Sequence, residues 1–357
     1  MAVVDSHFPW IVSGFRYHEG EELLRHRPDT LFFSLYEMTD PFPTRVYPLA
    51  EFPTRAAAAG VTDVYMVFFN WAAGILGVAG PDGGRGLDTA RKDISLLPTM
   101  TRWKMRGHIT IYPGGGLFPD TPQSAVKEVA RRSATVFTSV AEVMKIVPDA
   151  VPTTVPIPSN FYEFRSRRLA RKPRLVFVGD DRPRKGLVTL LEAMELVGPG
   201  YELDVVGPHE RHLARLESLG ARLHGWLEPE QLRQVLWECD IIVAPASGDR
   251  PEDGYGDTGI IDGFPTTAAR LGMLTGCCLV GSNPSADGSL LEPGLHYLEF
   301  PERDPVGLAR ALQQVSADDA LRDRIAMAGA ERLRSRCDVG HVIASKLEQM
   351  GLWRPAS

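Results

Sequence analysis

The sequence has few cysteines, no long apolar run and no excess of positive charge. Its 357 residues include four cysteines (Cys239, Cys277, Cys278, Cys337), whose spacing fits neither a metal site nor a disulfide framework. No run of about 18 apolar residues is present, so we expect no transmembrane helix. The first residues lack a basic segment followed by an apolar core. We therefore expect no signal peptide, reduced cysteines and a cytoplasmic location.

Charge and missing motifs exclude further classes of protein. The net charge of −6 argues against a nucleic-acid partner. The nine histidines show no metal-ligand spacing, and His209 and His212, three residues apart, are predicted to lie at the surface. The chain is not a P-loop protein, because G-x-x-x-x-G-K-[ST] is absent. A dinucleotide dehydrogenase is disfavoured, because no G-x-G-x-x-G follows a first strand.

Apolar segments alternate with helical patterns along the whole chain. At 357 residues, with 44% hydrophobic and 24% charged residues, two globular domains are expected. Strands are predicted at residues 2–5, 31–35, 64–69, 108–112, 135–138, 175–179, 203–207, 221–224, 241–245 and 279–281. Helices are predicted at 16–27, 123–132, 188–196, 213–219, 229–239, 305–315 and 320–334. This alternation predicts an α/β fold with parallel sheets and crossover helices.

A proline-rich and basic segment separates the two halves. It runs from Pro152 to Arg174 and contains a basic run at 165–172, which we interpret as a solvated linker, with contact to an anionic acceptor or membrane surface as the alternative. The predicted domains are residues 1–165 and 172–335. Residues 336–357 are predicted to form a helix that crosses back to the first domain.

A basic loop in the second half is the first candidate site. It runs from Gly179 to Gly186, directly after a strand and before a helix, and carries Arg182, Arg184 and Lys185. In an open parallel sheet, ligands collect at the carboxyl ends of the strands. Charge-assisted hydrogen bonds to phosphate oxygens are strong, so the three cations predict a diphosphate site. A solvated turn is the alternative.

A second stretch of the same half predicts a helix N-terminus facing a ligand. The residues Asp262, Gly263, Phe264, Pro265, Thr266 and Thr267 lead into a segment of small apolar residues that ends at Gly276. Free backbone N–H groups at a helix start favour an anion. Either Thr266 or Thr267 is expected to cap the helix, unless a ligand does so. An ordinary loop, helix and strand is the alternative.

The first half offers weaker candidates. Three glycines follow the strand at 108–112, namely Gly114, Gly115 and Gly116, and they would let a ligand approach the backbone. Gly14 lies in a similar short loop. His108 and His18 are candidates for orienting a sugar or moving a proton, although a buried structural histidine is the more common case.

The second half resembles the nucleotide-binding domain of family-4 glycosyltransferases, which have the GT-B fold. The resemblance runs from Arg174 to Arg334 and includes the basic loop at 179–186, the segment Gly225-Trp226-Leu227, the run 239–245 ending in proline, Asp262-Gly263-Phe264-Pro265 and the strand 276–282. The first half is similar more faintly, through 13–15, 112–116 and 137–160. The implied fold has two Rossmann-like domains whose parallel sheets face each other across a cleft.

The resemblance also implies a function and residue roles. It implies an enzyme of carbohydrate or glycoconjugate biosynthesis, a retaining, metal-independent glycosyltransferase that uses a nucleotide-diphosphate sugar as co-substrate and no further cofactor. Lys185, with Arg182 or Arg184, would hold the diphosphate, and the segment 264–267 would hold sugar and phosphate. The base would meet Gly225, Trp226 and Leu227, and Asp262 would stand in the family's acidic position. The glycines at 114–116 would let the first domain close over the phosphates.

The sequence departs from the family pattern at three places. Asp262 stands where the family has Glu. A second Glu, which usually holds the ribose, is replaced by Arg270 or Leu271, depending on the direction of counting. Asp180 stands where an Arg often follows the first glycine of the basic loop. Asp253 or Asp257 is a candidate replacement for the second Glu.

These departures keep other functions open. A non-catalytic nucleotide- or sugar-binding relative, or a partner subunit of a transferase, is the main alternative. A nucleotide-sugar epimerase is the third. The acceptor is a small molecule, a glycan or a glycolipid, and a homo-oligomer is left open.

Overall fold

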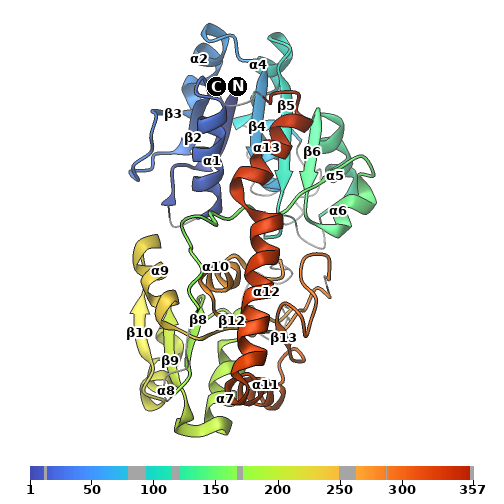
Figure 1. Cartoon of the computed structure of the whole chain (residues 1–357). Coiled ribbons are helices and arrows are strands. Elements are labelled where there is room, and N and C mark those ends of the chain that lie inside the picture. The colour runs from blue at the N-terminus through green and yellow to red at the C-terminus, as the bar shows by residue number, and fades with distance from the viewer. Residues whose placement is uncertain are drawn as a thin grey trace. The chain divides into compact units, whose positions relative to one another are not determined.

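The computed structural model describes residues 1–11, 14–78, 94–114, 117, 121–166, 172–248, 263–286 and 288–353. The chain divides into two compact units (Figure 1). Unit 1 comprises Met1–Pro156 and Val339–Ser357, and unit 2 comprises Ile157–Asp338. The chain leaves unit 1 at 156–157, inside the predicted boundary segment Pro152–Arg174 and before its basic run, and returns to unit 1 at 338–339.

Unit 1 contains a seven-stranded parallel sheet with the order β3-β2-β1-β4-β5-β6-β7. The strands are β1 (Ala2–His7), β2 (Leu31–Tyr36), β3 (Val46–Pro48), β4 (Asp63–Val67), β5 (Arg106–Ile111), β6 (Thr135–Thr138) and β7 (Val151–Pro152). The helices are α1 (Phe15–His26), α2 (Phe52–Ala58), α3 (Phe69–Ile75), α4 (Leu97–Arg102), α5 (Gln123–Arg131), α6 (Ala141–Ile146) and α13 (Val339–Gln349). A 3₁₀ turn, η2, spans Leu49–Glu51.

Alternating residues of the central strands of unit 1 point into two separate cores. Val64 and Met66 of β4 lie in one core, whereas Tyr65 and Val67 lie in the other. The second core also contains Leu347 of α13, which packs on α1. A sheet covered on both faces needs apolar residues at consecutive positions, which is why these strands read as continuous apolar runs.

Unit 2 contains a six-stranded parallel sheet with the order β10-β9-β8-β11-β12-β13. The strands are β8 (Arg174–Val178), β9 (Glu202–Val206), β10 (Arg222–Gly225), β11 (Ile241–Ala244), β12 (Cys278–Gly281) and β13 (Leu298–Glu299). The helices are α7 (Leu187–Val197), α8 (Leu213–Ser218), α9 (Pro229–Glu238), α10 (Thr267–Thr275), α11 (Pro305–Ala317) and α12 (Asp319–Cys337). Short 3₁₀ turns span Pro183–Lys185 (η4), Gly198–Gly200 (η5) and Glu210–His212 (η6).

The predicted α/β class with two parallel sheets is confirmed, while several short elements were not predicted. The strand predicted at 64–69 ends at Val67, because Phe68 adopts a φ of 76° and α3 begins at Phe69. In the proline-rich stretch, Pro53 occupies the first turn of α2, where a missing N–H costs no hydrogen bond.

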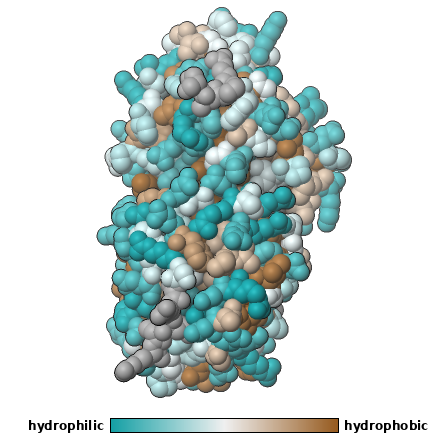
Figure 2. All heavy atoms as spheres, in the orientation of Figure 1, coloured by the Kyte–Doolittle hydropathy of each residue, from teal (hydrophilic) through white to brown (hydrophobic). Residues whose placement is uncertain are grey.

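None of the described helices is long and apolar enough to cross a membrane. Figure 2 shows a face that is mostly hydrophilic, with scattered hydrophobic residues.

A buried polar cluster fixes α13 to the rest of unit 1. The Nζ atom of Lys346 donates to Glu19 Oε1 at 2.5 Å, to Tyr65 Oη at 2.8 Å and to Tyr112 Oη at 2.6 Å. The side chains of Lys346 and Glu19 are each 2% exposed. Burial lowers the pKa of Lys346, and the charge of Glu19 opposes that change. Residues 327 positions apart in the sequence thus satisfy each other inside the domain.

Removing one partner of this pair is expected to destabilise unit 1. Lys346→Met leaves the Glu19 carboxylate buried without its cation, and we expect a loss of about 3–5 kcal/mol in the free energy of unfolding. Urea unfolding followed by fluorescence measures the loss. The double variant Lys346→Met, Glu19→Gln should recover part of it. Lys127→Met on the exposed face of α5 is the control, with a change below about 0.5 kcal/mol. An unchanged Lys346→Met transition contradicts the role of the cluster.

Candidate functional site

Three strand-end glycines lie in contact at the carboxyl edge of the unit 2 sheet. Gly179 follows β8, Gly207 follows β9 and Gly225 ends β10. The Gly179 N–H donates to Val206 O at 3.0 Å, and the Gly207 N–H donates to Gly225 O at 2.8 Å. A Cβ on Gly207 would lie 1.9 Å from Gly179 O, so only glycine fits there. The strand ends therefore pack main chain against main chain at this edge.

The basic loop is anchored to the neighbouring strand end. Its residues 183–185 form η4, and Gly186 has a φ of 74°. The Ser247 N–H donates to Arg184 O at 2.8 Å, and Ser247 Oγ donates to Pro183 O at 3.2 Å. Ser247 itself follows β11, so the loop after β8 is held against the end of β11.

The charges of the basic loop are partly paired within the loop. Arg182 Nε donates to both carboxylate oxygens of Asp180 at 2.9 Å, and its Nη2 makes a further close contact. Burial would raise the pKa of Asp180, but Arg182 and Lys185 lower it, so the carboxylate is ionised. Arg184 is buried, and Lys185 is half-buried. The loop therefore carries a net positive charge. An incoming anion would compete with Asp180 for Arg182.

The start of α10 faces the same sheet edge. Thr266 is the N-cap, and its side chain accepts from the Ala269 N–H at 3.3 Å, which confirms the predicted cap. Phe264 is buried against Tyr297, with ring centroids 4.9 Å apart, and Pro265 is also buried. Gly263, Thr266 and Thr267 are half-buried. A helix start that follows the end of a parallel strand offers backbone N–H groups to an anion.

Arg270 supports this helix start from inside. It is 5% exposed, and its Nε donates to Pro265 O at 3.0 Å. Arg270, one of the two residues that could stand at the second Glu position of the family pattern, thus holds the loop before α10. A buried guanidinium cannot replace a carboxylate that accepts hydrogen bonds from a ribose.

The segment after β10 presents an exposed aromatic ring. Gly225 has a φ of 63° with no atom within 4 Å of its Cβ position, so space is open beside it. Trp226 is 69% exposed, whereas Leu227 packs against the core of unit 2. The segment is thus held by packing at Leu227 and exposed at Trp226. An exposed aromatic ring of this kind can stack against a flat ligand ring.

His209 was expected at the surface, and that expectation is wrong. The residue is 7% exposed, and its Nε2 donates to Val206 O at 3.4 Å. Its ring lies 5.7 Å from that of Phe177, and burial lowers the pKa of the imidazole, which Asp181 and Asp180 partly offset. The burial of His209 was not predictable from the sequence, because the loop after β9 is polar and shows no apolar periodicity.

His108 was predicted to be catalytic, but the structure gives it a structural place. It is 1% exposed within β5, and its Nε2 lies 2.9 Å from Asp63 Oδ1. Its Nδ1 lies 3.2 Å from Thr135 Oγ1 on β6. His108 stands opposite Tyr65 in the middle of the sheet, before the carboxyl end of β5. A histidine with both nitrogens engaged inside the sheet is not available to a substrate.

The other predicted residues of unit 1 lie at loop starts. Gly14 precedes α1 with a φ of 59°, and its N–H donates to Ile11 O at 2.9 Å. Gly114 has a φ of 72° and follows β5. Both lie at the carboxyl edge of their own sheet. Gly115, Gly116 and Asp262 lie outside the described residues, as do Asp253 and Asp257.

Two serines of the unit 2 edge were missed in the sequence. Ser247 fixes the basic loop, and Ser282 Oγ donates to Ala246 O at 2.6 Å, which ties the end of β12 to the segment after β11. Each follows an apolar strand by one to three residues, and that position is the only signal the sequence offers. Within the described ranges, no group of three or more His, Cys, Asp or Glu residues is arranged to hold a metal ion.

Comparison with known proteins gives one family match. Residues 172–318, which contain the basic loop, the Gly225 segment and α10, match the family described as glycosyl transferases group 1. No curated protein matches the chain.

Solved structures show the same fold over the whole chain. HepE from Anabaena in complex with UDP has a TM-score of 0.71 at 12% identity, covering 98% of this chain and 100% of that one. Sucrose-phosphate synthase from Thermosynechococcus elongatus has a TM-score of 0.68 at 15% identity, covering 98% of each chain. A glycosyltransferase from Rickettsia africae has a TM-score of 0.65 at 11% identity, covering 98% of this chain and 97% of that one. The two-domain GT-B fold is thereby confirmed.

The contact between Gly186 and the end of β11 gives a stability test. A Cβ on Gly186 would lie 1.6 Å from Pro245 O, whereas Gly220, with a similar φ of 66°, has nothing within 4 Å. Gly220→Ala should cost about 1–2 kcal/mol, the price of left-handed backbone alone. Gly186→Ala should cost about 3 kcal/mol or more, because the loop must also move. Equal losses in urea unfolding would show that the loop is not held against Pro245.

Proposed function

We propose that the protein transfers a glycosyl group from a nucleotide-diphosphate sugar to an acceptor, because residues 172–318 match the family described as glycosyl transferases group 1. The observation that carries this proposal is the meeting of three features at one sheet edge in unit 2. These are the basic loop at 179–186, the start of α10 at Thr266, and the open segment after Gly225. A diphosphate, a sugar and a base need these three kinds of surface.

Uridine diphosphate sugars are the leading donor candidates. HepE, which shares the fold, has been solved with UDP and with UDP-glucose. In the proposed complex, Lys185 and Arg182 bind the diphosphate, and backbone N–H groups of 264–267 bind the sugar and its phosphate. Trp226 and Leu227 lie beside the base.

The proposed chemistry needs stabilisation of a leaving group. The bond between the anomeric carbon and the donor phosphate oxygen breaks, and its electron pair stays on the diphosphate. The acceptor oxygen forms the new bond to the anomeric carbon, and its proton passes to the departing diphosphate oxygen. Lys185 and Arg182 stabilise the growing phosphate charge, an effect worth several kcal/mol in a dry site. We propose that these cations replace a metal ion and that the anomeric configuration is retained.

The acceptor and the cellular setting belong to the same proposal. We assign the protein to the cytoplasm and to carbohydrate or glycoconjugate biosynthesis, a setting that the four buried free cysteines suit. Arg270 favours a second candidate function. Because neither Arg270 nor Leu271, the two residues that could stand at the position of the ribose-binding Glu, is acidic, a non-catalytic relative that binds a nucleotide or a sugar is the alternative.

Calorimetry with UDP, GDP, ADP and dTDP tests the donor site. We expect the wild-type chain to bind one of them, and Lys185→Ala to weaken that binding by about tenfold or more, since one charge-assisted hydrogen bond is worth about 1.5–3 kcal/mol. Lys172→Ala, at the opposite end of β8, should bind as the wild type does.

The outcomes separate the candidate functions. Binding without transfer or donor hydrolysis across a panel of nucleotide sugars would support the non-catalytic alternative. Product formation without any acceptor would indicate an epimerase. No binding of any nucleotide diphosphate would refute the proposed donor site, and product anomer analysis decides retention.

A further inference from the structure

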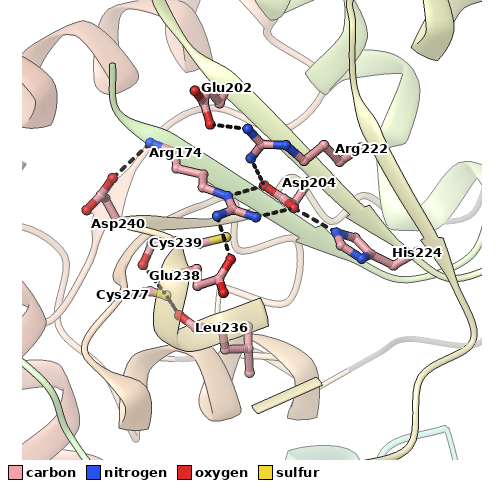
Figure 3. Close-up of polar contacts among 10 residues, drawn as sticks. All are labelled: Arg174, Glu202, Asp204, Arg222, His224, Leu236, Glu238, Cys239, Asp240 and Cys277. Atoms are coloured by element: carbon pink, nitrogen blue, oxygen red, sulfur yellow. Dashed lines mark hydrogen bonds and ion pairs between the residues drawn. The ribbon is translucent and has the colours of Figure 1, made fainter. Parts of the chain in front are cut away.

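An ion cluster around a buried carboxylate includes His224, the residue before the segment proposed to meet the base (Figure 3). At its centre is Asp204 of β9, whose side chain is 0% exposed. Arg174 of β8 donates to both of its oxygens, at 2.6 and 2.8 Å. Arg222 Nη1 lies 3.6 Å from Asp204 Oδ2, and Arg222 Nη2 donates to Glu202 Oε2 at 2.7 Å. Burial would raise the pKa of Asp204, but its hydrogen bonds with Arg174 and His224 lower it, so Asp204 is a carboxylate.

His224 connects this cluster to the proposed base segment. Its Nε2 lies 2.7 Å from Asp204 Oδ1. Because an ionised carboxylate only accepts hydrogen bonds, His224 Nε2 must carry the hydrogen. The next residue along the chain is Gly225, which opens the Gly225–Leu227 segment.

The backbone register shifts at His224. Leu223 pairs with Val205, and Gly225 pairs with Val206, so His224 is an extra residue in β10. Such an irregularity changes the direction in which a side chain points and in which the strand leaves the sheet. Here it accompanies a side chain bonded to Asp204 and a glycine with a φ of 63°.

Few apolar contacts hold the start of this segment. β10 is the edge strand of its sheet, and Arg222, Leu223 and Gly225 are exposed. An edge with few buried apolar contacts is among the least stable parts of a domain. Leu227 fixes the far end of the segment by packing on the core of unit 2, whereas the start of the segment depends on polar contacts, namely His224 to Asp204 on one side and Gly225 O to the Gly207 N–H on the other.

We propose that His224 is a positioning residue that, held by Asp204, sets the Gly225–Leu227 segment for recognition of the nucleotide base. The inference rests on the proposed donor site. It separates two tasks within that site. The basic loop binds the diphosphate, whereas the cluster around Asp204, which does not touch the ligand, orders the surface that distinguishes one base from another.

The test compares a nucleotide with its phosphate part alone. Inorganic pyrophosphate probes the basic loop, and the nucleoside diphosphate that the wild-type chain binds probes the loop and the base segment together. His224→Leu removes the hydrogen bond to Asp204. It should lower the affinity for the nucleotide by about tenfold and leave the affinity for pyrophosphate unchanged. It should also reduce the preference for that base over the other three. His224→Gln, which places an amide nitrogen near Nε2, should restore both properties.

Arg222→Leu is the matched control. It removes a charge from the same cluster and the same strand but leaves the contact of His224 intact, so it should change stability without changing base preference. If His224→Leu does not fold, the pair His224→Gln and His224→Asn carries the test, because the shorter Asn does not reach Asp204 and should lose base preference.

Three results would overturn the inference. One is nucleotide binding by His224→Leu, or by His224→Asn where Leu does not fold, equal to that of the wild type. Another is an equal loss of nucleotide and pyrophosphate affinity, which would show a general structural effect. The third is the same loss of base preference in Arg222→Leu. Failure of the proposed function gives a different result, in which the wild-type chain binds no nucleoside diphosphate, and the inference then falls with it.

Discussion

Close approach of main chain to main chain is the constraint on which the unit 2 edge depends. Gly207 meets Gly179 O, and Gly186 meets Pro245 O, at distances that leave no room for a Cβ. These contacts draw the loops after β8, β9 and β11 together, and Ser247 and Ser282 then fix the neighbouring carbonyl groups. The result is an edge made largely of backbone. The N–H groups of Gly179 and Gly207 are used in hydrogen bonds within this edge, so the groups that suit phosphate and sugar oxygens are the basic side chains of the loop after β8 and the N–H groups at the start of α10.

Electrostatics then decides what this surface can hold. The loop at 179–186 has three cations and two carboxylates, and Asp180 occupies Arg182 with short contacts. A diphosphate must therefore share Arg182 with Asp180 or displace it. This competition predicts weaker binding of a diphosphate than three unopposed cations would give. Lys185 helps to keep Asp180 ionised, so its removal is the most informative test of how the loop binds a diphosphate. The pairing also shows why a count of basic residues overstates the charge available to a ligand.

The sequence predicted most of the frame and part of the site. Apolar runs such as 175–179 became β8, because strands covered on both faces carry a continuous signal. The loop after β8 and the cap at Thr266 were predicted because strand order and local chemistry mark them. Contacts between distant residues were not predictable. Asp63 lies 45 positions from His108, and Glu19 lies 327 positions from Lys346, so neither partner was visible when each residue was considered alone. His108 was taken for a catalytic residue for that reason.

Arg270 departs from the family pattern and has a structural role of its own. Counted forward from Asp262, the position of the family's ribose-binding Glu holds Arg270, a buried cation that donates to Pro265 O and stabilises the loop before α10. A carboxylate at 270 would repel that carbonyl, so simple reversion to Glu would damage the helix start before it could help a ribose. In the proposed donor complex, a ribose contact would therefore come from another residue or from backbone. That requirement increases the importance of the Gly225–Leu227 segment, since base contacts then contribute more of the nucleoside affinity, and the ordering of that segment by His224 and Asp204 becomes part of donor recognition.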